Sequence, residues 1–152
     1  MNRVEISSAE SLEPLPWMHK LEAFALLILE KLKKNNWDIS ILLCDDETIR
    51  QLNAEYRNKN EPTDVLSFDL GETVEEDGEK RYLAGDIVIS LQTLYENAHY
   101  FSVEPDEEFR RLVIHGILHL SGMDHQTNDA SEPMLQFQEL LLEQTKEEHI
   151  LL

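Results

Sequence analysis

The chain has 152 residues, of which 41% are hydrophobic, and its 31 acidic side chains against 13 basic ones give a net charge of −18 at pH 7. This length and apolar content predict one domain, residues 1–152, with a single core and no need for a second domain. The charge excludes a protein that holds nucleic acid by neutralising phosphates over a broad basic face, so any RNA contact must be local.

Neither a membrane-spanning segment nor a secretory signal is recognisable in the sequence, and this bears on the expected compartment. No apolar run is long enough to span a bilayer, and the first residues do not show the charged-then-apolar pattern of a secretory signal. Cys44 is the single cysteine and follows the apolar residues 41–43, which indicates a buried structural thiol and no internal disulfide. We expect a cytoplasmic protein with no membrane partner.

The first half of the chain alternates strand and helix patterns. Residues 2–6 can form a strand, and apolar residues at helical spacing predict a helix over 16–34. Residues 37–44 are typical of a buried strand, and either Asp45 or Asp46 can cap the helix that follows. Residues 58–62 are expected to form a loop.

The second half begins with two strand patterns and ends in helices. The acidic stretch between the two strands, which contains Gly71 and Gly78, is expected to be a flexible hairpin connection. Pro105 and Pro133 are both suited to the first turn of a helix. In chain order we expect strands over 63–70 and 83–90, a helix after the cap Ser90 to about 101, a helix from 105, and a last helix from 131.

The helix from Pro105 is apolar around most of its circumference, which predicts that it is buried. Such a helix packed on strands gives an α+β or α/β fold. We favour α+β, with a small mixed sheet of about four strands and a zincin-like helix carrying a metal site at one edge of the core.

A cluster of histidines, HGILHLSGMDH at 115–125, is the strongest chemical signal. His115 and His119 are four residues apart and share one helix face. Gly122 can end the helix in a left-handed conformation, so that the chain folds back and brings His125 to the same place. Three imidazoles with an open fourth position are typical of a catalytic Zn²⁺ site, although nickel, cobalt and copper suit the same ligands.

Other polar residues near this motif are weaker candidates. His19, His99 and His149 stand alone and are expected to be surface or core residues rather than ligands. Arg111 and Glu108 lie on the histidine stripe one and two turns before His115; they could support the ligands, but a surface ion pair is the favoured interpretation.

The spacing of the histidines matches HExxHxxGxxH metalloproteases, except that Gly116 replaces the glutamate. That glutamate is the general base of peptide cleavage, so its absence argues against a peptidase. Phosphoryl transfer asks mainly for positive charge beside the phosphate, and Arg57, just before the loop 58–62, is the best candidate for that charge.

Three segments together resemble the YbeY family of bacterial endoribonucleases: LNAEYRNKNEPTDVLSFDL at 52–70, LAGDIVIS at 83–90 and HGILHLSGMDH at 115–125. The resemblance implies a metal-dependent enzyme that cuts single-stranded RNA in 16S rRNA 3′-end maturation and ribosome quality control. It implies that His115, His119 and His125 bind the metal, that Arg57 and His115 are catalytic, and that the partners are an rRNA precursor and the small ribosomal subunit with its proteins, not DNA.

The resemblance also bears on supporting residues. Thr63, Asp64, Ser67, Gly85 and Asp86 match family positions that look structural or supportive, and a carboxylate, Asp86 or Asp124, is expected to hold a ligand imidazole. Met123 stands where the family often has tyrosine, which removes a hydroxyl group near the metal.

Two alternatives stay open. A ribosome-assembly factor with a mainly structural metal would use its acidic surface to contact basic ribosomal proteins. A peptidase or other zinc hydrolase rests on the histidine spacing alone.

Overall fold

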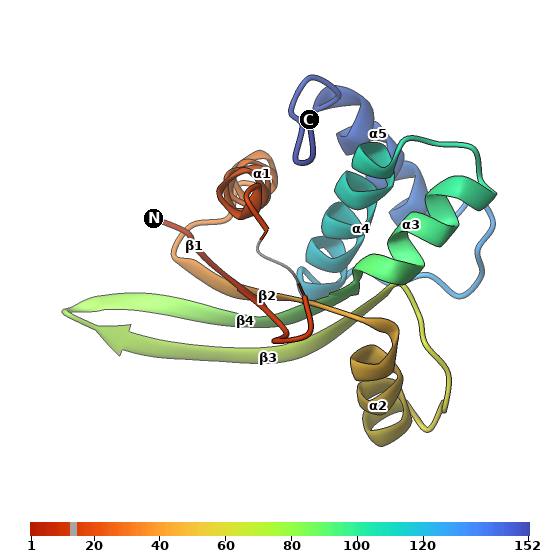
Figure 1. The fold of residues 1–152 in the computed structure, drawn as a ribbon. Helices are drawn as coiled ribbons and strands as arrows, with labels where there is room; N and C mark the ends of the chain where they lie inside the picture. Colours follow the sequence, from red (N-terminus) through yellow and green to blue (C-terminus); the bar gives the residue numbers. More distant parts are fainter. Residues whose placement is uncertain (13–14) are drawn as a thin grey trace.

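A mixed four-stranded sheet forms the centre of the computed structural model, which describes residues 1–12 and 15–152 (Figure 1). This confirms the α+β class and the expected number of strands. The elements are β1 (Arg3–Ser8), α1 (Met18–Lys31), β2 (Trp37–Cys44), α2 (Asp46–Arg57), β3 (Val65–Glu76), β4 (Glu79–Ser90), α3 (Leu91–Tyr100), α4 (Pro105–Leu120) and α5 (Pro133–Gln144).

The strands lie in the order β1-β2-β4-β3. β2 pairs in parallel with β1 and β4, whereas β3 pairs antiparallel with β4 and forms one edge of the sheet. In the register of the three strands, Ser40 and Phe68 both lie opposite Asp86. β3 is therefore an edge strand, paired on one side only, with β4.

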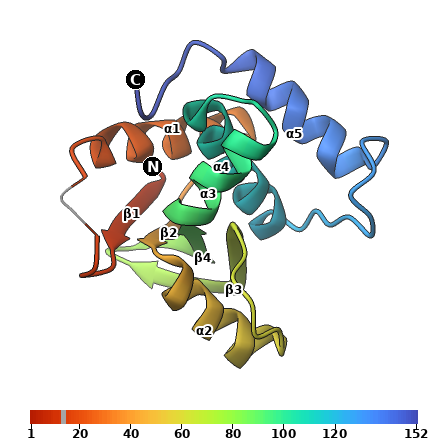
Figure 2. The ribbon, with the colours of Figure 1, turned by 45° about the vertical axis from the view of Figure 1, so that its right-hand side comes forward.

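The two faces of the sheet differ in their cover. In Figures 1 and 2, α1, α3, α4 and α5 lie on one side of the sheet and α2 alone lies on the other. Because successive strand residues point to opposite faces, Ile41 and Ile87 join the main core, whereas Ser40 and Asp86 point to the α2 side. The α2 side is thus only partly covered.

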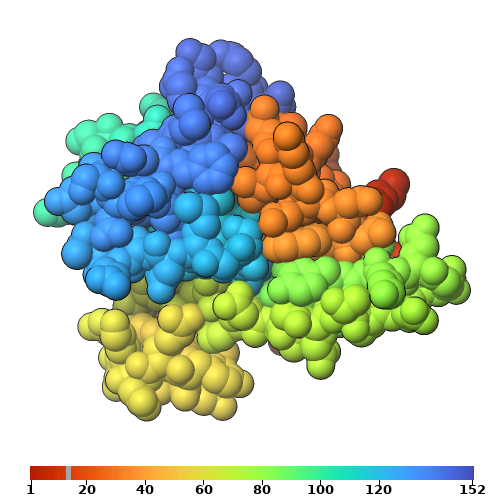
Figure 3. All heavy atoms as spheres, turned by 180° about the vertical axis from the view of Figure 1, so that it is seen from behind, coloured from red at the N-terminus to blue at the C-terminus, as the bar shows by residue number. Residues whose placement is uncertain are grey.

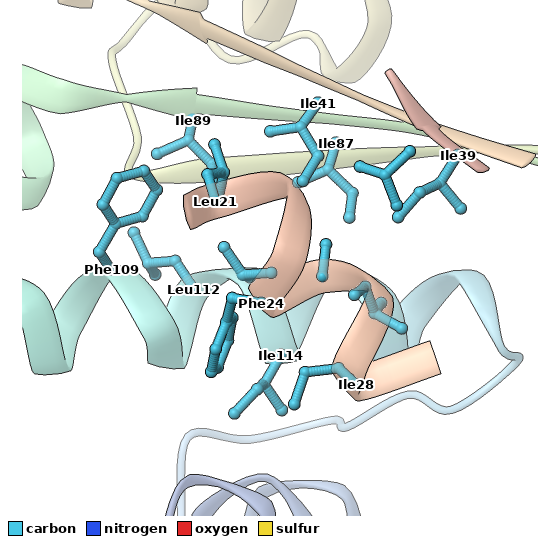
Figure 4. Close-up of a cluster of buried hydrophobic side chains, with 14 of the residues drawn as sticks. Leu21, Phe24, Ile28, Ile39, Ile41, Ile87, Ile89, Phe109, Leu112 and Ile114 are labelled. Carbon is cyan, nitrogen blue, oxygen red and sulfur yellow. The ribbon is translucent and has the colours of Figure 1, made fainter. Parts of the chain in front are cut away.

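The main core lies between the sheet, α1 and α4 (Figure 4). Phe109 is fully buried and its ring meets that of Trp17 edge to face at 5.2 Å. Eleven of the sixteen residues of α4 are buried, which confirms the prediction for this helix. No helix among residues 1–12 and 15–152 is long and apolar enough to cross a membrane.

A smaller core under α2 includes Cys44, whose thiol is buried as expected. Burial raises the pKa of Cys44 to about 12, and the neighbouring Asp45 and Asp46 act in the same direction. A thiol with this pKa is protonated at neutral pH, which agrees with a structural role.

The acidic stretch joins β3 and β4 as a hairpin, as expected, but it is regular strand rather than a flexible connection. Residues 71–82 extend β3 and β4 into one long hairpin, which projects from the body of the protein in Figure 1. Asp77 and Gly78 both have positive φ, 52° and 83°, and such a pair makes the two-residue turn that suits a hairpin. The strand was missed because residues 72–80 are exposed on both faces, so no apolar alternation marks it.

Smaller differences lie at the ends of helices. α1 ends at Lys31 rather than Lys34 because Lys33 takes a left-handed conformation, φ 59°. α5 begins at Pro133 rather than Ser131. Of the two cap candidates, Asp45 is the one that caps α2, since its side chain accepts a hydrogen bond from the Thr48 N–H at 2.9 Å.

Candidate metal centre

The three histidines of the motif come together where α4 ends. His115 and His119 lie one turn apart on α4, and Gly122, with φ +101°, lets the chain turn back. The Met123 N–H donates to the Leu118 carbonyl at 3.0 Å and holds this turn. The ring nitrogens of His115, His119 and His125 lie within 4.8 Å of one another, as the spacing predicted.

Each imidazole is oriented by an oxygen atom on its Nδ1 side. The partners are the Gln138 side-chain oxygen at 2.7 Å for His115, the Met123 carbonyl at 3.1 Å for His119, and the Thr127 carbonyl at 2.8 Å for His125. Since these oxygens can only accept, each Nδ1 carries the proton and each Nε2 keeps its lone pair.

The Nε2 atoms are therefore available as ligands. Those of His115 and His119 lie 3.1 Å apart, and two unprotonated nitrogens cannot hydrogen-bond to each other. Two nitrogens bound tetrahedrally to zinc would lie about 3.3 Å apart. The three residues thus fit a single metal ion held by three imidazoles.

Burial also favours the neutral form of these ligands. It lowers the pKa of His115 and of His119, while their hydrogen bonds to Gln138 and Met123 act in the opposite direction. Proximity of the other imidazoles lowers both values further. Both imidazoles are consequently neutral at pH 7, with a proton on Nδ1 and none on Nε2, and this is the state that binds a metal.

A network of polar side chains fixes Gln138, which the sequence did not single out. The Gln138 amide nitrogen donates to Glu139 at 3.0 Å, so its oxygen faces His115. Arg111 in turn donates to Glu139 at 3.0 Å and to Glu108 at 2.9 Å. Glu108 is only 5% exposed, so the expected surface ion pair is in fact a largely buried support for the metal site.

The expectation that a carboxylate holds a ligand imidazole was wrong. Asp86 accepts a hydrogen bond from Ser40 on the other face of the sheet. Asp124 is exposed, lies 4.0 Å from His119 Nδ1, and accepts instead from the His125 N–H at 2.8 Å. The three imidazoles are instead held by one amide side chain and two backbone carbonyls. A backbone partner cannot be recognised from the sequence, because every residue has a carbonyl group.

Arg57 reaches the same site from the opposite side of the sheet. Asn58, with φ 58°, ends α2 and makes Arg57 its last residue. The Arg57 guanidinium donates to the Ser67 carbonyl at 2.7 Å on β3. Arg57, His115 and His119 line one small pocket of about 100 Å³. In Figure 3 the segment around α2 borders the segment that follows α4.

Gly116 lines this pocket as well, and its size is required by packing. A Cβ atom at this position would lie 2.9 Å from the Ile87 side chain, which is closer than such contacts normally allow. A glutamate of the protease type would therefore disturb the contact between α4 and β4. Packing against Ile87 is thus a physical reason for glycine at this position.

The remaining candidates have structural positions. The Asp64 carboxylate accepts from Asn97 at 3.2 Å and its carbonyl accepts from the Ser90 N–H at 3.0 Å, so it ties β3 to α3 and β4. Met123 packs its side chain against the main core. Within residues 1–12 and 15–152, His19, His99 and His149 belong to no metal-binding group.

Replacing Gln138 by alanine is expected to weaken metal binding by about 10- to 100-fold, because His115 loses the partner that fixes its orientation and tautomer. Titration of the metal-free protein with zinc against a competing chelator would measure this. Gln136→Ala, an exposed glutamine on the same helix, is the control. Equal affinity of the Gln138 variant and the wild type would show that the contact is incidental.

An α+β domain with three imidazoles around one open position has the arrangement typical of small metal-dependent hydrolases. The solution structure of TM1509 from Thermotoga maritima is similar to the chain, with a TM-score of 0.64 and 28% identity over 95% of this chain and 90% of that one.

Relatives in sequence define the family. The family model described as Endoribonuclease YbeY matches residues 7–146. Endoribonuclease YbeY of Treponema denticola is 53% identical over 128 residues, which cover 84% of this chain and 83% of that protein. The protein of the same name from Treponema pallidum (strain Nichols) is 46% identical over 95% of this chain and 90% of its own length. The chain belongs to the endoribonuclease YbeY family and is by that membership an endoribonuclease.

Proposed function

We propose that this endoribonuclease cuts single-stranded RNA at the cluster of His115, His119 and His125, with Zn²⁺ as the metal and Arg57 as the catalytic cation. The observation that carries the proposal is the pocket shared by Arg57 and two of the ligands. We further propose that the substrate is a ribosomal RNA precursor in the cytoplasm, cut during 16S rRNA 3′-end maturation and ribosome quality control.

The work of Arg57 follows from its contacts. One of its five N–H donors is used by the Ser67 carbonyl, which fixes the guanidinium at the rim of the pocket. Among residues 1–12 and 15–152 its other donors have no hydrogen-bond partner, so they can bind the equatorial oxygens of a phosphodiester, where negative charge increases in the transition state. A bound zinc ion would supply a Lewis acid on the other side of that phosphate.

The local cation also resolves the conflict between RNA binding and a net charge of −18. Arg57 and the metal would place positive charge at the reacting phosphate, although the chain as a whole is acidic. Affinity for RNA would then depend on few phosphate contacts, and the salt dependence of binding would be shallow.

A direct test combines metal analysis with cleavage of a single-stranded ribosomal RNA precursor. His119→Ala is expected to lose both bound zinc and cleavage, whereas His99→Ala, an exposed histidine on α3, is expected to keep both. Cleavage that survives the loss of metal would place the active site elsewhere. Peptide cleavage without RNA cleavage would favour the peptidase alternative.

The projecting hairpin favours a second role beside cleavage. Its tip carries Glu75, Glu76, Asp77 and Glu79, all exposed, and such a surface suits basic ribosomal proteins of the small subunit. If this contact were the main function, the His119→Ala variant would still support ribosome maturation in cells despite its loss of cleavage.

A further inference from the structure

A second hollow lies on the face of the sheet that α2 only partly covers. It is a groove of about 560 Å³, which is within the range of small-molecule and cofactor sites. Its floor is apolar, and polar groups converge on it from the sheet. Among the residues that line it are Ser40, Tyr56, Phe68, Asp69 and Asp86.

The groove and the metal site meet across the edge strand β3. Ser67 and Phe68 are neighbours, so they point to opposite faces: Ser67 lines the pocket with the histidines and Phe68 lines the groove. Arg57 contacts both, since it donates to the Ser67 carbonyl and its guanidinium carbon lies 5.7 Å from the centre of the Phe68 ring. A strand of RNA with one phosphate at Arg57 can therefore place an adjoining base over the edge of β3.

The exposed ring of Tyr56 lies beside Phe68 at this edge of β3 and offers an aromatic surface for stacking. Tyr56 is 61% exposed although it is a large side chain, and its ring meets the Phe68 ring edge to face at 5.4 Å. The contact holds the Tyr56 ring while leaving much of its surface open. An open, oriented ring beside an arginine is the arrangement on which unpaired bases stack.

The polar groups of the groove are acceptors. Asp86 stands in the middle of β4 and accepts from the Ser40 hydroxyl through Oδ1. Within residues 1–12 and 15–152, its Oδ2 has no hydrogen-bond partner, and no lysine or arginine lines the groove. Asp69 adds a second carboxylate. The groove thus repels phosphate and accepts N–H donors.

We infer that this groove is a subsite for one unpaired nucleobase next to the cleaved phosphate, with Tyr56 as the stacking platform and Asp86 as the group that selects the base. Guanine fits best, because its N1–H and amino group lie side by side and match a carboxylate. Uracil fits worst, because two carbonyl oxygens flank its N3–H. The inference rests on the proposed cleavage of single-stranded RNA.

Binding of a short 2′-O-methyl oligouridine, checked to remain uncut, tests the subsite by fluorescence anisotropy. An oligonucleotide with one guanosine is expected to bind wild type about tenfold more tightly than the all-uridine form. Asp86→Asn keeps an acceptor for Ser40 but is expected to abolish this preference. Tyr56→Ala is expected to weaken both oligonucleotides roughly tenfold, whereas Tyr95→Ala, an exposed tyrosine on α3, should change neither.

Equal binding of the two oligonucleotides by wild type, or an unchanged preference in Asp86→Asn, would overturn the subsite. If an oligolysine peptide bound instead and lost affinity in Asp86→Asn, the groove would belong to a basic protein segment. Cleavage is scored separately, with a ribosomal RNA precursor. A protein that shows the guanine preference but does not cut would refute the proposed function and leave the base subsite standing.

Discussion

Replacing Arg57 by alanine is expected to lower the rate of RNA cleavage by about 10²- to 10³-fold and to leave the bound metal unchanged. The reason is that Arg57 lines the pocket beside two of the histidines and does not belong to the metal-binding group, so in the proposed mechanism its loss would remove charge beside the phosphate and nothing from the metal site. Single-turnover cleavage of a ribosomal RNA precursor, with metal content measured on the same sample, would check both parts.

The chain offers a close control for this experiment. Arg50 lies two turns earlier on α2 and is paired with Glu47 at its surface, away from the histidines. Arg50→Ala changes the net charge equally and should leave cleavage nearly unchanged. Arg57→Lys should recover only part of the rate, because an ammonium group lacks the planar fork that binds two oxygens. A fully active Arg57→Ala would remove this residue from the mechanism.

The metal cluster could be predicted from the sequence because its geometry is local. His115, His119 and Gly122 belong to one helix and its end, where the spacing of residues along the chain fixes their spacing in three dimensions. Arg57 could be proposed from its place before the loop 58–62 and from the family resemblance, but its position beside the histidines could not, since no local pattern joins α2 to α4. The fold brings them together across the edge of β3.

Features that depend on tertiary packing were not predicted. Gln138 lies on a different helix from His115, and nothing in the sequence around a glutamine in an amphipathic helix indicates which residue it will contact. Asp86 was expected at the metal because it matched a family segment, but strand alternation turns it to the other face. The hairpin itself was expected, but the continuation of its strands through the acidic stretch was missed, since exposed acidic strands lack the apolar periodicity on which strand prediction depends.

The last part of the chain is held by a buried carboxylate at the start of α4. Asp106 is 3% exposed and accepts hydrogen bonds from Arg110 Nε at 3.0 Å and His149 Nδ1 at 2.9 Å. It also accepts from the N–H groups of Ile150 and Leu151 at 2.7 and 2.8 Å. Since Ile150 is fully buried in the main core, this one carboxylate links α4 to the end of the chain.

Replacing Asp106 by asparagine is therefore expected to lower the free energy of unfolding by about 3 kcal/mol at pH 7. The substitution keeps the shape of the side chain but leaves the buried Arg110 without its counter-charge. Urea unfolding would measure the loss. Glu143→Gln, which removes a carboxylate from an exposed pair with Lys146, should have no resolvable effect.

The difference in the free energy of unfolding between wild type and Asp106→Asn should also depend on pH, which gives a second test. Burial opposes ionisation of Asp106, but the bonds from His149, Leu151, Ile150 and Arg110 outweigh it and lower the pKa below the ordinary value. A lowered folded-state pKa contributes stability that is fully present above the unfolded pKa of about 3.9 and disappears as pH falls through the folded value. The gap between wild type and Asp106→Asn should thus be constant from about pH 5 to 7 and narrow in more acid solution. A gap that widened with acid would mean that the carboxylate is not the charged link in this network.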